Sequence, residues 1–184
     1  GAGLCDQYYS FKHEGYDIDY TALEITPKFV QFAKEGGINI SLMTHPDKID
    51  FKDNSFEVVM CLDVLNHQIC YKSLIKEVIR VSKKIAIFSF FKPFILEDRP
   101  PEMQPKVALE VLEHHQRGDM EKTPVGALCT KNKDKNGLAT CYHHFFHVEE
   151  IERFLNTLGV EYFFSTPMYD ASDSQRRNLI IRKK

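Results

Sequence analysis

Two glycines and one glutamate carry the first chemical signal in this sequence. The chain begins Gly1-Ala2-Gly3, and Glu24 follows Gly3 by 21 residues, at the end of the mostly apolar run Tyr20–Leu23. A glycine turn lets the backbone approach a ligand closely, and a carboxylate at that distance can accept two ribose hydroxyls. This spacing predicts the nucleoside-binding half of a Rossmann-type fold.

Asp6 separates two classes of nucleoside ligand. Nicotinamide and flavin sites have a third glycine at this position, where a helix N-terminus faces the pyrophosphate. A carboxylate there would repel a phosphate by roughly 1–4 kcal/mol at about 4 Å in a high-dielectric setting. S-adenosylmethionine (SAM) has no phosphate, and its sulfonium and ammonium groups tolerate a nearby acid. Asp6 therefore favours SAM, and a nicotinamide oxidoreductase remains the less favoured alternative.

The composition is that of a soluble globular chain. The 184 residues are 43% hydrophobic and 27% charged, which predicts one domain, and no apolar run reaches the roughly 18 residues of a membrane span. The net charge of −2, with acids and bases interspersed, gives no basic field for nucleic acid. Five cysteines without a CxxC pair or a signal peptide predict reduced thiols and a cytoplasmic location.

Strand and helix patterns alternate along the first half of the chain. Thr26 followed by Pro27 is typical of a helix start, and Gly36-Gly37 of a helix end. The predicted strands are 22–25, 38–43, 56–62, 85–90, 160–165 and 178–182, and the predicted helices include 6–13, 27–34, 72–81 and 148–158. The alternation predicts a parallel sheet with right-handed crossovers, in which 56–62 is suited to a central position.

The pattern changes after Pro93. Three prolines between residues 100 and 105 interrupt it, and polar, loop-like sequence follows. An insertion of this size after a sheet strand often covers a ligand. Residues 96–142 are therefore predicted to form a substrate cap within a single domain of residues 1–184.

Five segments of the chain match motifs of one family in the same order. They are Gly1–Cys5, Leu23–Pro27, Asp50–Val59, Leu62–His67 and Ile75–Val81. They correspond to a GxGxG turn, the acid of a second strand with the following helix start, an LPFxDxSFDVV-like stretch, an EVLEH-like segment and an LxEixRVLKP-like helix. The chain thus resembles the class I SAM-dependent methyltransferases, specifically the small-molecule branch that includes ubiquinone-biosynthesis-type enzymes.

The resemblance implies an α/β, Rossmann-like fold. It implies a seven-stranded sheet, with the last strand antiparallel and helices on its faces, and SAM across the C-terminal ends of strands one to four. It also implies a first strand and an acid before Gly1. We therefore expect that the first strand is missing from the chain shown, or that its termini have been altered.

The same resemblance implies the residues that hold SAM. They are Gly1, Ala2 and Gly3 at the methionine part, Glu24 on the ribose, Ile25 on the adenine ring, and Cys61, Leu62 and Asp63 at the amino-acid end. The chain departs from the family at Cys5, which replaces a third glycine and is tolerable if its side chain points away. It also has His45-Pro46 where the family often has Asp-Ala, so Asp47 or a backbone carbonyl is expected at the adenine amino group.

Methyl transfer is an in-line displacement, so the protein positions a nucleophile and supplies a base where one is needed. Histidine suits this task at neutral pH, and the candidates are His67, His143 and His144. Cys141, His143, His144 and His147 could also be read as a metal cluster, as in methyltransferases that hold a catechol-like acceptor. Their spacing fits no structural zinc pattern, and no metal site is predicted.

The sequence thus predicts a SAM-dependent methyltransferase that acts on oxygen or nitrogen of a small molecule. The alternatives are a non-catalytic, methyltransferase-like SAM-binding or assembly protein and, less favoured, the nicotinamide oxidoreductase. A small-molecule acceptor is the expected partner, with no nucleic acid and no membrane, and a homodimer is left open.

Overall fold

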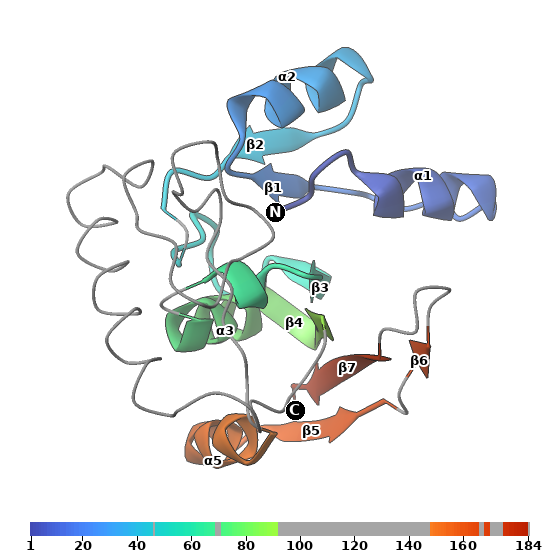
Figure 1. Cartoon of the computed structure of the whole chain (residues 1–184). Coiled ribbons are helices and arrows are strands. Elements are labelled where there is room, and N and C mark those ends of the chain that lie inside the picture. Colours follow the sequence, from blue (N-terminus) through green and yellow to red (C-terminus); the bar gives the residue numbers. More distant parts are fainter. Residues whose placement is uncertain (46, 69–70, 92–147, 166–167, 170–174, 184) are drawn as a thin grey trace, which may run out of the picture. The chain divides into compact units, whose positions relative to one another are not determined.

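The computed structural model describes residues 1–45, 47–68, 71–91, 148–165, 168–169 and 175–183 (Figure 1). They form two compact units, Gly1–Ile49 and Asp50–Lys184. The cap predicted at 96–142 lies outside the described residues, so the cap and the single domain around it stay predictions. No helix within the described ranges is long and apolar enough to cross a membrane.

The N-terminal unit pairs two short parallel strands. It comprises α1 (Asp6–His13), β1 (Ala22–Glu24), α2 (Pro27–Glu35) and β2 (Ile40–Leu42). Ala22 is in register with Ile40, and Glu24 with Leu42, so both strands end at the same edge. The predicted ends of the second helix are confirmed, because Thr26 is its N-cap and Gly36 its C-cap.

A small apolar core holds this unit together. Val30 and Ala33 lie three residues apart, hence on one face of α2, and both are buried. The buried members of the core are Cys5, Ala22, Val30, Ala33, Ile38 and Ile40. Helix α1 has no fully buried residue, but Tyr8 on it packs against this core, and Cys5 in the turn before it belongs to the core.

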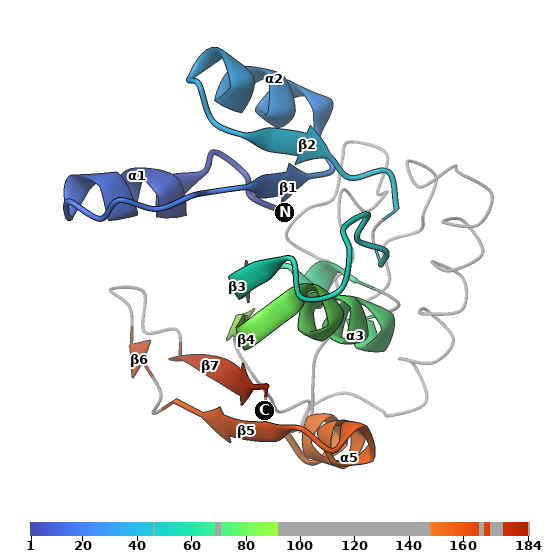
Figure 2. The same cartoon turned by 180° about the vertical axis from the view of Figure 1, so that it is seen from behind.

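The C-terminal unit contains a five-stranded mixed sheet (Figure 2). Its elements are β3 (Phe56–Cys61), the 3-10 helix η1 (Leu65–His67), α3 (Tyr71–Val81), β4 (Ser82–Phe91), α5 (Val148–Leu158), β5 (Glu161–Phe164), β6 (Met168–Tyr169) and β7 (Gln175–Arg182). The strand order is β3-β4-β7-β5, and β6 pairs with β7. Strands β3 and β4 are parallel, whereas β7 is antiparallel to both β4 and β5.

The sheet confirms part of the prediction. The last strand is antiparallel, as the resemblance implies. A single seven-stranded sheet is not confirmed among the described strands, because β1 and β2 form a separate two-stranded sheet. Strand β3 was predicted to be central, but it is an edge of the described five-stranded sheet, and Val58 on it is 47% exposed.

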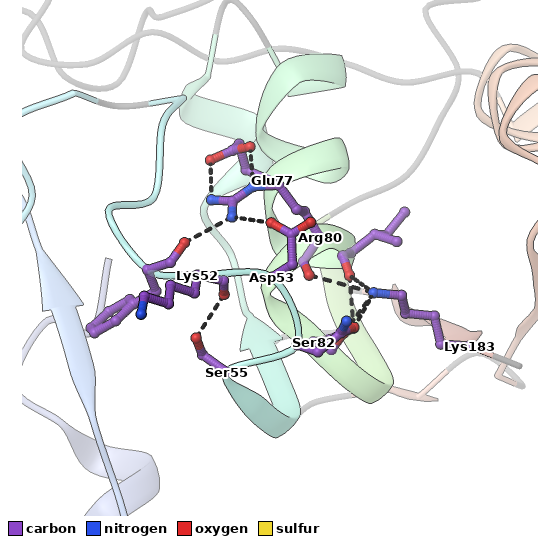
Figure 3. A network of polar contacts seen from close by, with 10 residues as sticks. Lys52, Asp53, Ser55, Glu77, Arg80, Ser82 and Lys183 are labelled. Atoms are coloured by element: carbon purple, nitrogen blue, oxygen red, sulfur yellow. Dashed lines mark hydrogen bonds and ion pairs between the residues drawn. The ribbon is translucent and has the colours of Figure 1, made fainter.

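A polar network fastens the C-terminal end of α3 (Figure 3). The Arg80 guanidinium donates to both carboxylate oxygens of Glu77, at 2.7 and 2.8 Å, to Asp53 at 2.8 Å, and to the carbonyl of Phe51 at 2.7 Å. Beside it, the Lys183 ammonium donates to the Asn54 side chain at 2.6 Å and to carbonyls at the junction of α3 and β4. The network joins the loop before β3, the helix and the end of β7, away from the ends where β3 and β4 finish.

This network predicts that Arg80→Lys destabilises the protein. A lysine ammonium cannot reproduce the planar fork that binds Glu77, Asp53 and a carbonyl together. We expect a loss of about 1–2 kcal/mol in the free energy of unfolding, measured by urea denaturation. Lys83→Met is the control, because the solvent-exposed pair of Lys83 with Glu57 should contribute little to stability. Equal losses in the two variants would contradict the role given to Arg80.

Candidate cofactor site

The carboxylate of Glu24 joins the glycine turn to the start of α2. Its Oε2 accepts the backbone N–H of Gly3 at 2.7 Å, and its Oε1 accepts those of Ile25 and Thr26, each at 2.9 Å. Next to it, the N–H of Ala2 donates to the carbonyl of Leu23 at 2.9 Å. The two sequence features predicted to share a site are therefore in direct contact.

Glu24 is only 4% exposed, yet it is held as a carboxylate. Burial by itself would raise its pKa, but the backbone hydrogen bonds from Gly3 and Thr26, together with the N-terminal ammonium charge and the Thr26 side chain, lower the pKa below its usual value. The carboxylate also lies just ahead of the N-terminus of α2, where the helix dipole favours negative charge. At neutral pH Glu24 is therefore an ionised hydrogen-bond acceptor.

The surroundings of Glu24 fit a nucleoside. Gly3 has φ +56°, and a Cβ added to it would meet none of the described atoms within 4 Å, so the turn presents bare backbone. Ile25, the next residue after Glu24, is 53% exposed and offers an apolar surface to a ring. Asp47 lies half-buried in the turn after β2. The ends of β1 and β2 lie side by side, because the N–H of Met43 donates to the carbonyl of Glu24 at 2.8 Å.

Cys5 shows how the chain does without the third glycine. It adopts φ 61°, a left-handed conformation that favours glycine, and its side chain is fully buried in the core of the N-terminal unit. The thiol therefore points away from the turn, which is the condition on which the sequence tolerates it. Burial raises the pKa of Cys5, so this thiol is not a nucleophile at neutral pH.

Asp6 is exposed in the first turn of α1. A pyrophosphate placed at this helix N-terminus would meet its carboxylate. Asp6 therefore lies at the helix N-terminus, where its carboxylate would repel the pyrophosphate of a dinucleotide.

The other predicted cofactor residues lie in the C-terminal unit, where β3 ends. Cys61 is buried, and burial raises its pKa to about 12, so it is a neutral core thiol. Leu62 and Asp63 follow it, and Asp63 adopts φ 55°. The N–H of Asp63 donates to the Ser89 hydroxyl at 2.7 Å, and that hydroxyl donates to Asp63 Oδ1 at 2.8 Å. The sequence analysis did not find Ser89, since a serine late in a strand pattern has no motif of its own.

The structure describes one of the three histidines predicted to act as a base. His67 is exposed at the end of η1, and its N–H donates to the carbonyl of Val64 at 2.9 Å. His143 and His144 lie outside the described residues, as do Cys141 and His147. Within the described ranges no group of three His, Cys, Asp or Glu side chains could hold a metal ion.

Comparison with known proteins identifies the class. Residues 1–90 match the family described as a methyltransferase domain. No curated protein sequence matches the chain significantly. Among solved structures, a SAM-dependent methyltransferase from Thermotoga maritima, described as a possible histamine N-methyltransferase, is similar with a TM-score of 0.60 at 13% identity, over 100% of this chain and 79% of that one.

Two further structures show the same fold. The magnesium protoporphyrin IX methyltransferase from Synechocystis with bound S-adenosylhomocysteine (SAH) is similar with a TM-score of 0.58 at 18% identity, over 100% of this chain and 72% of that one. The cyclase SpnF is similar with a TM-score of 0.62 at 14% identity, and the likeness covers 100% of this chain and 72% of the cyclase chain. These likenesses show a Rossmann-like fold. The match of residues 1–90 to a methyltransferase domain supports a SAM-dependent methyltransferase with SAM as its cofactor.

The lowered pKa of Glu24 predicts a pH dependence of stability. Because the pKa is lower in the folded state, the stabilisation is complete above the ordinary value of about 4.3 and is lost as the pH falls through the lowered value. We expect Glu24→Gln to reduce the free energy of unfolding by about 1.5–3 kcal/mol at pH 7 and by less below about pH 4.

Urea denaturation at both pH values would measure this difference. Glu35→Gln is the control, since Glu35 is exposed on the same unit and bonds only to Gln31 in the described residues. A deficit of Glu24→Gln that does not change with pH would show that its charge does not hold the turn.

Proposed function

We propose that the protein transfers the methyl group of SAM to an oxygen or nitrogen of a small-molecule acceptor. The observation that carries the proposal is the ionised Glu24 carboxylate bonded to the backbone of Gly3, beside an open glycine turn. This is the pair of groups that a ribose and the adjoining methionine part of SAM require.

The hydrogen bonds of Glu24 limit what it can do for the ribose. A carboxylate has about four acceptor positions, and the backbone of Gly3, Ile25 and Thr26 occupies three of them. Oε1 accepts two of these N–H groups and Oε2 accepts one, and the Thr26 side chain also hydrogen-bonds the carboxylate, so Oε2 is the oxygen with fewer backbone partners. We therefore propose that Glu24 binds one ribose hydroxyl through Oε2, where the sequence alone suggested two.

The remaining contacts are assigned by the resemblance. The backbone of Gly1, Ala2 and Gly3 admits the methionine part, Ile25 packs on adenine, and Asp47 accepts from the adenine amino group. Cys61, Leu62 and Asp63 face the amino-acid end. The exposed side chain of Ile25 and the sharp turn of the backbone at Asp63 support two of these assignments.

Bound SAM supplies an electrophilic methyl group on a sulfonium. The acceptor's lone pair forms the bond to the methyl carbon, the carbon–sulfur bond breaks with its electron pair left on sulfur, and SAH is the product. The acceptor's proton goes to a base, for which we propose His67, with His143 and His144 as the further candidates. The exposed position of His67 just after β3 supports its access to an acceptor.

The small-molecule acceptor rests on the family resemblance and on the predicted cap. One similar structure is described as a possible histamine N-methyltransferase, and another is a magnesium protoporphyrin IX methyltransferase. The third is a cyclase, so the fold by itself does not specify the reaction. The alternative, a methyltransferase-like binding or assembly protein, would use the same cofactor site without transferring a methyl group.

Glu24→Ala tests the placement of SAM. We expect the variant to bind SAM and SAH more weakly by about 1.5–3 kcal/mol, the scale of hydrogen bonds to a charged group, as measured by titration calorimetry. Glu35→Ala, a glutamate on the exposed face of α2, should bind both ligands like the wild type. NAD should not raise the melting temperature, whereas SAH should.

The outcomes separate the hypotheses. Wild-type protein that binds neither SAM nor SAH would remove the proposed function, and stabilisation by NAD would favour the oxidoreductase. Unchanged affinity in Glu24→Ala would show that the ribose lies elsewhere.

His67→Ala tests the proposed base. With labelled SAM and a panel of phenols, catechols and amines, we expect kcat for the accepted substrate to fall by about 10²–10⁴-fold while the Kd of SAM does not change. His13→Ala, on exposed α1, is the control. A His67→Ala enzyme with wild-type kcat would move the base to His143 or His144, or remove the need for one.

A further inference from the structure

Ser89 is placed to control the backbone that follows β3. Strands β3 and β4 are parallel, with Cys61 opposite Phe88, so Ser89 lies one residue beyond the last pair of their ladder. Its side chain is 5% exposed. The hydroxyl therefore lies in the sheet just past the end of the β3–β4 ladder, while β4 continues to Phe91, and this is near the edge at which ligands bind in open α/β folds.

The Ser89 hydroxyl makes two hydrogen bonds to the same residue, Asp63. It accepts from the Asp63 N–H at 2.7 Å and donates to Asp63 Oδ1 at 2.8 Å, so both its donor and one acceptor position serve Asp63. Such a two-point contact fixes the peptide and the carboxylate of Asp63 together.

Asp63 needs this support because its backbone is left-handed. Its φ is 55°, which is uncommon for a residue with a Cβ and persists where surrounding contacts over-determine it. The turn carries the chain from the end of β3 into η1 within three residues. A relaxed Asp63 would redirect the carbonyls of Cys61 and Leu62.

We propose that Ser89 is a positioning residue for SAM: through its two hydrogen bonds it holds Asp63 in the conformation that receives the amino-acid end of the cofactor. The inference rests on the proposed function, since that assigns Cys61–Asp63 to this end of SAM. It adds a residue that makes no contact with the ligand itself and acts only through Asp63.

The test uses two ligands that differ at the amino-acid end. SAH and 5′-methylthioadenosine share adenine, ribose and sulfur, but the second lacks the amino-acid group. Ser89→Ala should bind SAH about tenfold more weakly and methylthioadenosine with unchanged affinity, by titration calorimetry. Glu24→Ala should weaken both ligands, because both carry the ribose.

Ser82→Ala is the matched control. Ser82 is 1% exposed at the other end of the same strand, and its hydroxyl bonds to the carbonyl of Ile79 at 3.1 Å. Ser82→Ala loses one buried hydrogen bond, whereas Ser89→Ala loses two. The bond lost in Ser82→Ala lies at the start of β4, away from Asp63. The affinity of this variant for both ligands should equal that of the wild type.

The results distinguish two failures. Suppose that wild-type protein binds SAH. If Ser89→Ala then binds SAH equally well, or has lost the same factor of affinity for both ligands, the positioning role is wrong and the proposed function stands. If wild-type protein binds neither ligand, the proposed function is wrong and the role of Ser89 falls with it. Should Ser89→Ala fail to fold, Ser89→Thr, which keeps a hydroxyl, should retain the wild-type ratio of the two affinities, and a changed ratio would overturn the proposal.

Discussion

The N-terminal unit depends on one buried charge. Glu24 ends β1, and its carboxylate receives N–H groups from the glycine turn on one side and from the start of α2 on the other. A buried carboxylate is unfavourable unless it is fully hydrogen-bonded, and here charge-assisted bonds from the backbone meet that need. The turn in return stays open, since no described atom lies within 4 Å of a Cβ added to Gly3. The group proposed to bind the ribose thus also builds the surface on which the cofactor is proposed to lie.

Left-handed backbone recurs in sharp turns of the described chain. Among the described residues other than glycine, φ is positive at Cys5, Asn54 and Asp63. Cys5 follows the glycine turn and is held by complete burial, whereas Asp63 follows β3 and is held by Ser89. Asn54 belongs to the polar network at the other end of the sheet, where its side chain accepts a hydrogen bond from Lys183 after β7. Two different contacts, one apolar and one polar, therefore keep sharp turns where the chain leaves regular structure.

Local signals explain how much of this could be read from the sequence. Thr26-Pro27 and Gly36-Gly37 marked the ends of α2, because capping preferences act within a few residues. Strand β6 has only two residues, and alternation of apolar residues carries no signal over that length. Strand β4 was predicted at 85–90, but it begins directly after α3 at Ser82. The edge position of β3 depends on pairing between distant segments. The spacing of Gly3 and Glu24 predicted a shared site, but the three backbone bonds to the carboxylate and the role of Ser89 needed tertiary structure.

The most direct test of the account is a crystal structure of the protein with SAH. The account predicts a ribose hydroxyl within hydrogen-bonding distance of Glu24 Oε2, with Gly3 still bonded to that oxygen, and the amino-acid end of the ligand beside the backbone of Cys61–Asp63. SAH bound away from Glu24, or a ribose that displaces the N–H of Gly3 from the carboxylate, would contradict it.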